Sequence, residues 1–442
     1  MSKRELIKNA ALVCAAILCL CIAIAGCKKK PEEKPVVPVT LESVAVTTPP
    51  TKTIYNVDDK FDPAGMVVTA TYSDNSKAPV TVTETMISYD FKTAGTKTVT
   101  ITVTEKGITK TATVDGITVL LFSGAGTSGD PYQIGTPADL ALLAELVNAD
   151  NTDYNNKYYK LTADIDLSAY GAGFNEGKGW IPIGFDGGGI NDKPFIGNFD
   201  GGGFKVSGLY INDSDPGGAG LFGYVYDGTI ANLGVTGADI TCGEYNTGGV
   251  VGIVWSGSVT NCYATGVVKG NNQVGGVVGY AFYSSITNCY ATGTVSGVYH
   301  VGGVVGSVDG RGSITNCYAT GAVSGYQFVG GVTGFNNGSL INCVALNPSI
   351  TREGSDTYYT TFGRVAGYNS TGTLSNNVAL ENMAALGGIT FGTGAHDNEN
   401  GANITAAEAK QQATYEALGW DFSTVWQIDE GAALLMINAN NG

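Results

Sequence analysis

The sequence predicts an all-β protein in which a separate β-domain precedes a solenoid of stacked coils. The frame Gly-Val-Val-Gly occurs at residues 249–252, 276–279 and 303–306, and Asn-Cys-Tyr-Ala-Thr-Gly follows it from Asn261, Asn288 and Asn316. A period of about 27 residues, built from β-formers and punctuated by glycine, indicates stacked coils instead of a closed globular domain. The 64 glycines and 14% charged residues also describe a turn-rich β-protein with few catalytic groups.

The length and the acidic net charge of the chain limit which kinds of partner it can bind. A chain of 442 residues can hold two or three domains and bury a large core. Its formal net charge is -15, so we expect no nucleic-acid partner and no attraction to an anionic membrane surface, since both require a basic face. We also expect no cofactor, no metal ion and a monomeric chain.

The N-terminus is typical of an export signal. Three basic residues precede an apolar run over residues 10–25, which suits a signal peptide but is short for a membrane-spanning helix. The run ends in Ile24-Ala25-Gly26-Cys27, which resembles the bacterial lipobox, where a signal peptidase cuts before the cysteine and its thiol carries a diacylglycerol. Residues 1–26 are therefore predicted to be a lipoprotein signal peptide, with an uncleaved anchor helix as the alternative.

The mature chain would then begin at Cys27 and attach to the envelope by lipid alone, without spanning a bilayer. Residues 27–38 combine prolines with charges and read as an extended tether. Lys28 follows the cysteine in place of Asp, and by the enterobacterial sorting pattern this favours the outer membrane in a cell that has one; the outer surface of the plasma membrane is the other location.

Residues 39–121 predict a β-sandwich. Alternating runs at residues 41–46, 66–72 and 97–103 are separated by turn clusters such as Ser73-Asp74-Asn75-Ser76. The series from Tyr55 onward resembles the bacterial immunoglobulin-like domains that act as spacers in surface proteins. The resemblance implies a spacer, and a separate binding role stays open.

Residues 126–219 predict an N-terminal cap and the first irregular coils. Thr136-Pro137-Ala138-Asp139 supplies an N-cap residue, a proline at the first helical position and an acid three residues beyond the cap. Leucines follow at helical spacing, so we expect a short amphipathic helix that covers the open end of the solenoid.

Residues 220–383 form the regular repeats, and residues 384–442 predict a C-terminal cap. The coils close at Gly223, Gly252, Gly279, Gly306, Gly334 and Gly367. Thr405-Ala406-Ala407-Glu408 predicts a capping box that starts a helix reaching about Leu418. The apolar cluster that follows, from Trp420 to Ile428, is expected to close the second end.

The repeats carry a resemblance to a known family. Gly-Leu-Phe-Gly at residues 220–223 and the Gly-Gly-Val-Val-Gly units, with Asn-Cys-Tyr-Ala-Thr-Gly between them, resemble the GLUG repeats of bacterial surface proteins. The likeness spans residues 126–383 and implies a right-handed parallel β-helix at the cell surface. Some proteins with such repeats carry an immunoglobulin A-cleaving metalloprotease, but this chain has no His-Glu-x-x-His, and His300 and His396 lie far apart.

Five cysteines remain after the signal segment and Cys27 are set aside: Cys242, Cys262, Cys289, Cys317 and Cys343. Stacked coils would hold the last four about 4.8 Å apart. Side chains at equivalent positions of parallel strands point in the same direction and not toward each other. We therefore interpret these cysteines as small apolar residues that fill the interior, with disulfides as the alternative. No CxxC pair or histidine cluster suggests a metal site.

The parity of the repeat predicts which residues face outward. The Cys position and the alanine two residues on suit the crowded interior, so Tyr263, Tyr290 and Tyr318 should form a ladder on an outer face. Such a ladder either stabilises neighbouring coils by stacking or offers a platform for sugar rings.

The turn before each Gly-Gly varies while the frame around it holds. These turns occupy residues 244–246, 271–273, 298–300 and 326–328. Loops on a rigid solenoid often carry recognition, so Tyr245, Tyr299, Tyr326 and Phe328 are candidate contacts to a glycan or a protein epitope. The alternative, to which we give equal weight, is that the turns vary because nothing restricts their sequence.

The sequence as a whole predicts a lipid-anchored bacterial surface protein that binds a glycan or a host or bacterial surface protein without catalysis. The first alternative is a polysaccharide lyase or hydrolase on the same β-helix, which would need clustered carboxylates. The acids between Asp186 and Asp227 are plentiful but do not recur at coil spacing. The second alternative is a purely structural envelope protein.

Overall fold

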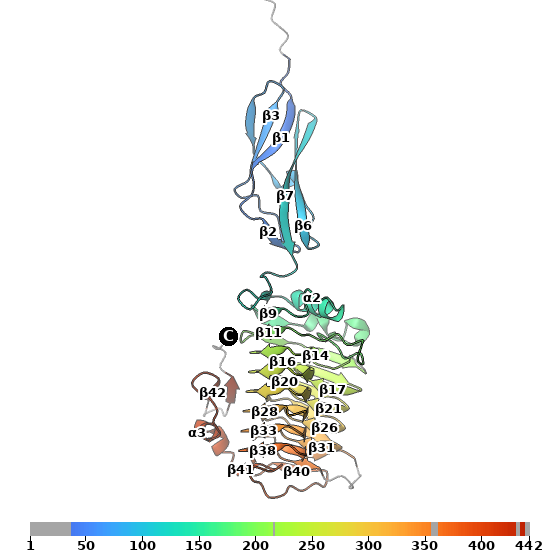
Figure 1. The fold of residues 1–442 in the computed structure, drawn as a ribbon, viewed down its shortest axis with the longest axis vertical. Coiled ribbons are helices and arrows are strands. Elements are labelled where there is room, and N and C mark those ends of the chain that lie inside the picture. The colour runs from blue at the N-terminus through green and yellow to red at the C-terminus, as the bar shows by residue number, and fades with distance from the viewer. Residues whose placement is uncertain (1–36, 215–216, 355–360, 430–433, 438–442) are drawn as a thin grey trace, which may run out of the picture. The chain divides into compact units, whose positions relative to one another are not determined.

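A computed structural model describes residues 37–214, 217–354, 361–429 and 434–437 (Figure 1). The predicted signal peptide, Cys27 and nearly all of the tether lie outside the described residues. The chain divides into two compact units, residues 1–121 and 122–442, which are described separately.

The first unit is a β-sandwich, as predicted. One sheet contains β1 (Leu41–Thr48), β3 (Val67–Tyr72) and β4 (Lys77–Val80), and the other contains β2 (Ile54–Asn56), β7 (Ile108–Leu120), β6 (Gly95–Glu105) and β5 (Ile87–Ser88), which follows the short helix η1 (Glu84–Met86). Alternate residues of each strand point inward, so Val44 and Val68 of one sheet share a core with Val99, Ile101 and Ile117 of the other.

The second unit is a parallel β-helix, and among its described residues four parallel sheets run along the stack (Figure 1). The first contains β8 (Tyr132–Ile134), β9 (Tyr158–Leu161), β11 (Asn198–Asp200), β15 (Thr229–Ala231), β19 (Ser258–Thr260), β23 (Ser285–Thr287), β28 (Ser313–Thr315), β33 (Ser339–Ile341) and β38 (Thr373–Ser375). The second contains β14 (Phe222–Tyr226), β18 (Val251–Trp255), β22 (Val278–Phe282), β27 (Val305–Asp309), β32 (Thr333–Asn336) and β37 (Ala366–Asn369).

The third sheet contains β17 (Tyr245–Gly248), β21 (Asn272–Gly275), β26 (Tyr299–Gly302), β31 (Gln327–Gly330) and β36 (Phe362–Gly363). The fourth contains β10 (Ile165–Asp166), β12 (Lys205–Ser207), β13 (Tyr210–Asp213), β16 (Gly234–Cys242), β20 (Tyr263–Lys269), β24 (Tyr290–Ala291), β25 (Thr294–Ser296), β29 (Tyr318–Ala319), β30 (Val323–Gly325), β34 (Val344–Ala345), β35 (Ser349–Arg352), β39 (Val378–Leu380), β40 (Ala384–Leu386) and β41 (Ala402–Ile404).

The predicted N-terminal helix is α2 (Pro137–Asn148), and it lies over the first coils (Figure 1). The Thr136 hydroxyl accepts from the backbone N–H of Asp139, whose carboxylate accepts from the N–H of Thr136. This capping box fixes where the helix begins, and the helix buries Leu140, Leu143 and Val147 against the coils. Two short helices, η2 (Ser168–Tyr170) and η3 (Asn175–Gly177), interrupt the irregular coils that follow.

The interior of the solenoid matches the predicted parity. Equivalent residues pair from coil to coil, so Ala264, Ala291 and Ala319 stand in one register row. The four repeated cysteines are buried thiols that form no disulfide, and each Sγ donates to backbone carbonyls; for example, Cys262 Sγ lies 3.2 Å from the Thr260 oxygen. The interpretation of the cysteines as interior fillers is therefore confirmed.

Glycine in the repeated frame follows from the close approach of neighbouring coils. A Cβ on Gly276 would lie 2.2 Å from the carbonyl oxygen of Gly303 and 2.5 Å from the Ala291 Cβ. A Cβ on Gly279 would lie 2.5 Å from the backbone nitrogen of Thr247. Any side chain at these positions would force the coils apart.

An asparagine ladder also runs along the stack. Its members are Asn232, Asn261, Asn288, Asn316, Asn342 and Asn376, each with a φ of 53–56°. From Asn261 onward each side-chain amide donates to the side-chain oxygen of the previous asparagine at 2.9–3.3 Å, and Asn232 donates to Asp200 Oδ1. Asparagine tolerates this left-handed backbone better than most residues, so the ladder holds a strained turn in the same place on every coil.

The C-terminal segment corrects two predictions. The capping box forms at Thr405 and Glu408, but the extended backbone of Gln411 divides the expected helix into η4 (Glu408–Lys410) and α3 (Gln412–Glu416). The frame does not end near Met383, since β40 and β41 still pair with earlier coils.

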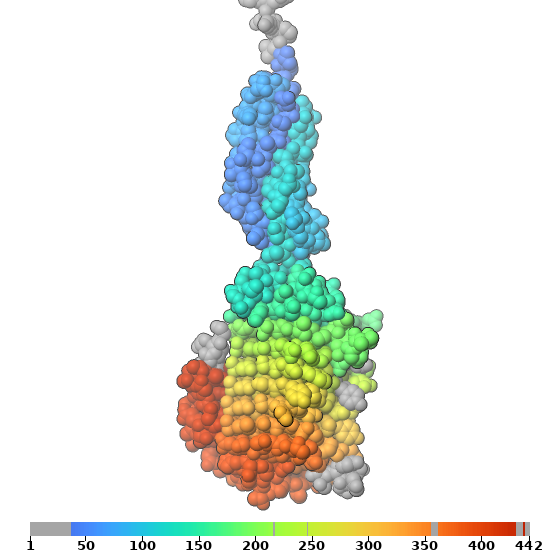
Figure 2. Space-filling view, in the orientation of Figure 1, coloured from blue at the N-terminus to red at the C-terminus, as the bar shows by residue number. Residues whose placement is uncertain are grey.

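The apolar cluster from Trp420 to Ile428 does not close the end of the solenoid. Trp420 and Trp426 instead pack against Tyr290 and Tyr318 on the side of the stack, and β42 (Trp426–Asp429) pairs with β43 (Leu434–Ile437) beside it (Figures 1 and 2). Stacked tyrosine rings form an apolar surface, and covering it removes that surface from water.

Among the described residues, no helix combines the length and apolar character needed to cross a membrane.

We expect Gly276→Ala to destabilise the second unit by about 1–3 kcal/mol, because the new Cβ meets backbone that cannot rotate away. Gly173→Ala is the matched control, since a Cβ there has no neighbour within 4 Å. Urea unfolding followed by circular dichroism should show a lower midpoint for the first variant alone. Equal midpoints would contradict the close-approach explanation.

Candidate ligand-binding groove

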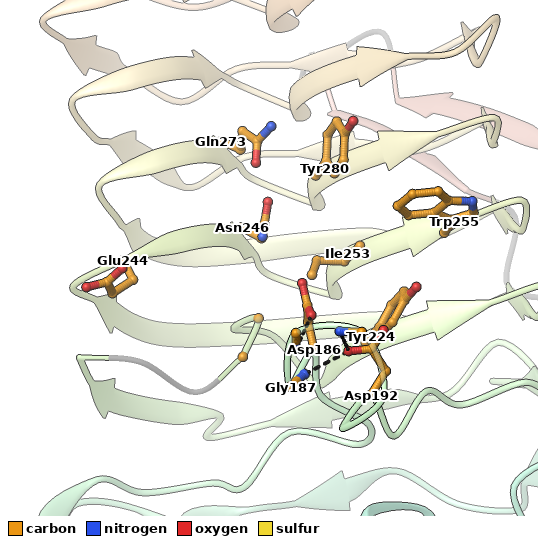
Figure 3. A pocket seen from close by; sticks show the side chains of 14 residues that line it. Asp186, Gly187, Asp192, Tyr224, Glu244, Asn246, Ile253, Trp255, Gln273 and Tyr280 are labelled. Carbon is orange, nitrogen blue, oxygen red and sulfur yellow. Dashed lines mark hydrogen bonds between the residues drawn. The ribbon is translucent and has the colours of Figure 1, made fainter.

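A groove of about 820 Å³ lies on the outer face of the second sheet, where strands β14, β18 and β22 meet the first strands of the third sheet (Figure 3). Its lining comprises Asp186, Gly187, Gly188, Gly189, Asp192, Gly217, Gly218, Tyr224, Glu244, Asn246, Ile253, Trp255, Gln273 and Tyr280. The volume falls within the range of small-molecule and oligosaccharide sites.

One wall of the groove is aromatic. Tyr224, Ile253 and Tyr280 form a register row on successive coils. Two residues further along the same strands, Tyr226, Trp255 and Phe282 form a second row, which we call the aromatic strip. Tyr226 and Trp255 are 39% and 38% exposed, and they are neighbours in this row. The rows arise because the residues between them, such as Val254 and Ala281, point into the core.

The opposite wall carries amides. Asn246 and Gln273 occupy the second positions of β17 and β21, both with positive φ (60° and 57°), and Figure 3 shows them facing the Tyr224–Tyr280 row. Among the described residues, the buried Oδ1 of Asn246 has no hydrogen-bond partner. An unpaired buried acceptor costs free energy, so this oxygen is a strained feature of the turn.

One end of the groove is acidic. Asp192 Oδ1 accepts from the backbone N–H groups of Gly187 (3.0 Å) and Gly189 (2.9 Å), and Asp186 Oδ1 accepts from Gly188 (3.0 Å). With Glu244, the lining therefore includes three carboxylates, and none of the described lining residues is Lys, Arg or His. This field disfavours an anionic ligand.

The tyrosine hydroxyls of the groove stay protonated at neutral pH. Burial, with the nearby carboxylates of Asp192 and Asp186, raises the pKa of Tyr224 to about 12. Burial and the charge of Asp309 raise the pKa of Tyr280 to about 12 as well. Both hydroxyls can therefore donate to and accept from a polar ligand.

The predicted tyrosine ladder exists but does not form an open face. The rings of Tyr263 and Tyr290, and of Tyr290 and Tyr318, stack with centroids 4.9 Å apart. Tyr290 and Tyr318 are only 7% and 2% exposed because the C-terminal segment covers them, and Tyr263 is half-buried. The expectation of an exposed ladder that could bind sugar rings is therefore corrected.

Among the described side chains, the aromatic residues of the variable turns do not line the groove. Tyr299 and Tyr326 contact each other edge to face at 5.8 Å, and Phe328 packs against His300 at 5.0 Å. The side chain of Tyr245 lies outside what the structure describes. The turns nevertheless supply Glu244, Asn246 and Gln273 to the groove. The variable turns thus contribute to the groove, but with residues other than the predicted aromatic ones.

Sequence reasoning missed the aromatic wall, although a signal exists. After each closing glycine the pattern alternates, as in Gly223-Tyr224-Val225-Tyr226 and Gly252-Ile253-Val254-Trp255. The same parity argument that placed Cys and Ala inside would have placed these side chains outside.

A partly buried aromatic cluster, with Tyr368 at its exposed edge, lies further along the stack. His300 contacts Phe328 and Phe335, with ring centroids 5.0 and 5.1 Å apart, and Phe328 contacts Tyr368 at 5.3 Å. Burial lowers the pKa of His300 to about 4, so the imidazole is neutral at physiological pH.

Comparison with known proteins supports the two-unit reading. Residues 48–115 match the bacterial Ig-like domain (group 3), and residues 243–269, 270–296 and 297–324 match the GLUG motif. The chain therefore contains a bacterial immunoglobulin-like domain followed by GLUG repeats on a β-helix, as the sequence predicted.

Two curated relatives share part of the chain. Halomucin of Haloquadratum walsbyi is 36% identical over 185 residues, which is 41% of this chain and 2% of halomucin. A candidate Gly-rich membrane protein of Evansella cellulosilytica is 38% identical over 120 residues, which is 27% of this chain and 12% of that protein. The chain thus spans a small fraction of either relative. The matches describe a surface-protein-like chain and agree with a location in the cell envelope.

A solved structure shares the fold. The crystal structure of a candidate immunoglobulin A1 protease from Bacteroides ovatus superposes with a TM-score of 0.55 at 22% identity, and the match covers 72% of this chain and 94% of that one. At this identity the likeness concerns the fold alone.

We expect the buried His300 to make stability pH-dependent. An unfolded histidine has a pKa near 6.5 and the folded pKa is about 4, so the unfolded state binds the proton more readily between these values. Stability should be complete above about pH 6.5 and fall by up to about 3 kcal/mol as the pH drops to 4.

Thermal unfolding of the protein and of His300→Gln, measured from pH 7 to pH 4, tests this. Glutamine already stands at the equivalent position of the previous coil, as Gln273, so the variant should fold and lose part of the pH slope. His396→Gln, at an exposed position, is the control. An unchanged slope in His300→Gln would contradict the prediction.

Proposed function

We propose that this protein binds a neutral glycan of its surroundings through the groove and the aromatic strip, without cleaving it, while it is attached to the cell envelope. The observation that carries the proposal is the pairing of the exposed ring of Trp255 with amides and tyrosine hydroxyls in one groove. Aromatic faces contact the C–H faces of pyranose rings, while amides and hydroxyls bond the ring substituents.

The charge of the groove supports a neutral ligand. Three carboxylates line the groove, and an acidic chain with a net charge of -15 repels polyanions at long range. Sugar hydroxyls suit this environment because each can donate to a carboxylate and accept from a tyrosine hydroxyl of the lining.

Binding is favoured over polysaccharide cleavage by the way the acids are used. Asp186 and Asp192 already accept backbone N–H groups of their own loop, which is typical of carboxylates that hold a loop in shape. Among the described residues, no group of three or more His, Cys, Asp or Glu side chains could hold a metal ion. A protein epitope in place of a glycan is the second candidate ligand, since the strip is exposed and aromatic.

For the attachment, we propose acylation of Cys27 within Ile24-Ala25-Gly26-Cys27. Cells expressing the protein should incorporate a fatty-acid analogue into it, and Cys27→Ala should lose the label because no other cysteine follows a lipobox. Cys242→Ala, which removes a buried thiol, is the control that keeps the label. Label that persists in Cys27→Ala would contradict the proposal.

For the groove, the purified protein should be retained on an array of neutral glycans. We expect Trp255→Ala to weaken binding about 10-fold, which corresponds to about 1.4 kcal/mol and to the loss of one ring contact. Tyr299→Ser removes a similarly exposed ring (38%) outside the groove and should bind as the unmodified protein does.

Three outcomes would overturn this proposal. They are the absence of retention on any neutral glycan, equal loss of binding in both variants, and release of shortened sugars from the bound glycan, which would favour an enzyme.

A further inference from the structure

The groove has a regular spacing that a ligand chain can match. Successive coils pair as parallel strands, which lie about 4.8 Å apart. The stacked rings of Tyr263, Tyr290 and Tyr318 measure this advance in the protein itself, at 4.9 Å per coil. The aromatic strip places one ring per coil, at Tyr226, Trp255 and Phe282, and Trp255 is the one that lines the groove. The rings of Trp255 and Phe282 have centroids 4.4 Å apart and are tilted by 56°.

Few glycan backbones advance by that length for each sugar. In an extended β-1,4-linked chain of equatorially joined pyranoses, each sugar advances by close to one strand spacing, so the chain is nearly straight. An α-1,4-linked or β-1,3-linked chain coils, and its advance per sugar along the chain axis is much shorter. Only the extended chain would place successive sugars on successive coils, with each sugar turned by about half a rotation relative to the one before it.

The amide wall has the same period. Tyr245 pairs with Asn272 and Thr247 with Val274, so Asn246 and Gln273 stand one coil apart at equivalent positions. One amide per coil faces the Tyr224–Tyr280 row (Figure 3). A chain lying along the stack would meet one aromatic ring and, on two of the three coils, one amide for each sugar.

The site is also limited in length. In the next coil the two rows continue with Ser307, which is buried at 2% exposure, and with Asp309, so the aromatic strip stops after Phe282. At the other end the loop of Asp186 and Asp192 lies beside Tyr224 (Figure 3). Three coils carry the strip, which is room for about three sugars.

We infer that the groove selects an extended β-1,4-linked neutral glycan, bound parallel to the axis of the solenoid with one sugar per coil and a minimum length of three sugars. The inference rests on the proposed function and adds to it the linkage, the direction and the length of the ligand.

Isothermal titration of the purified full chain tests this with oligosaccharides of two to six sugars. The β-1,4-linked probes are cello-, chito- and manno-oligosaccharides, and the α-1,4-linked malto- and β-1,3-linked laminari-oligosaccharides are matched in length. We expect at least one β-1,4-linked series to bind. Its trisaccharide should bind at least 10-fold more tightly than its disaccharide, with little gain beyond four sugars, and at least 10-fold more tightly than the other linkages.

Substitutions in the aromatic strip test whether the gain in affinity with sugar length arises there. Tyr226→Ser and Trp255→Ala should each reduce the gain from two to three sugars, while Tyr158→Ser, an exposed tyrosine outside the groove, should preserve it. Should a variant fail to fold, the length series on the unmodified protein still decides.

The outcomes separate the two proposals. Tighter binding of malto- or laminari-oligosaccharides that depends on Trp255, or affinity that rises evenly from two to six sugars, would overturn the inference and leave glycan binding standing. Binding of no neutral oligosaccharide would overturn both.

Discussion

In-register hydrogen bonding between equivalent residues of successive coils is the constraint on which the rest of the second unit depends. It places each backbone one strand spacing from the next, so Gly276 and Gly279 can carry no side chain and Ala291 must be small. It also aligns the asparagine amides into a continuous ladder that holds the left-handed turn of every coil. The sequence therefore repeats because each coil makes the same backbone contact with the next.

The same constraint aligns outward-facing residues of successive coils in rows. Two of these rows are aromatic, and they differ in whether other residues cover them. The tyrosine row through Tyr290 and Tyr318 is flat and stacked, and Trp420 and Trp426 bury it. The strip through Trp255 stays partly exposed beside amides, hydroxyls and carboxylates. An apolar row without polar neighbours is best stabilised by packing, whereas an aromatic row with polar neighbours retains the mixed surface that recognition uses.

Most of the architecture could be predicted from the sequence because it is local and periodic. The period predicted the coils, the parity predicted the buried cysteines and alanines, and Thr136 with Asp139 predicted the start of α2. The place of the C-terminal segment could not be predicted, because its partner, the tyrosine row, lies about a hundred residues earlier in the sequence. The groove combines the loop at Asp186, the turn at Asn246 and the strand at Trp255, which only the coiling of the chain brings together.

We propose that the distance between successive coils selects the linkage of the bound glycan. A crystal structure of the protein with a β-1,4-linked trisaccharide tests this proposal. We expect three sugars parallel to the axis of the solenoid, on the coils of Tyr226, Trp255 and Phe282, with the Asn246 amide bonded to a ring substituent. A sugar chain that crosses the coils, or one that lies on Tyr299 and Tyr326 instead, would contradict it.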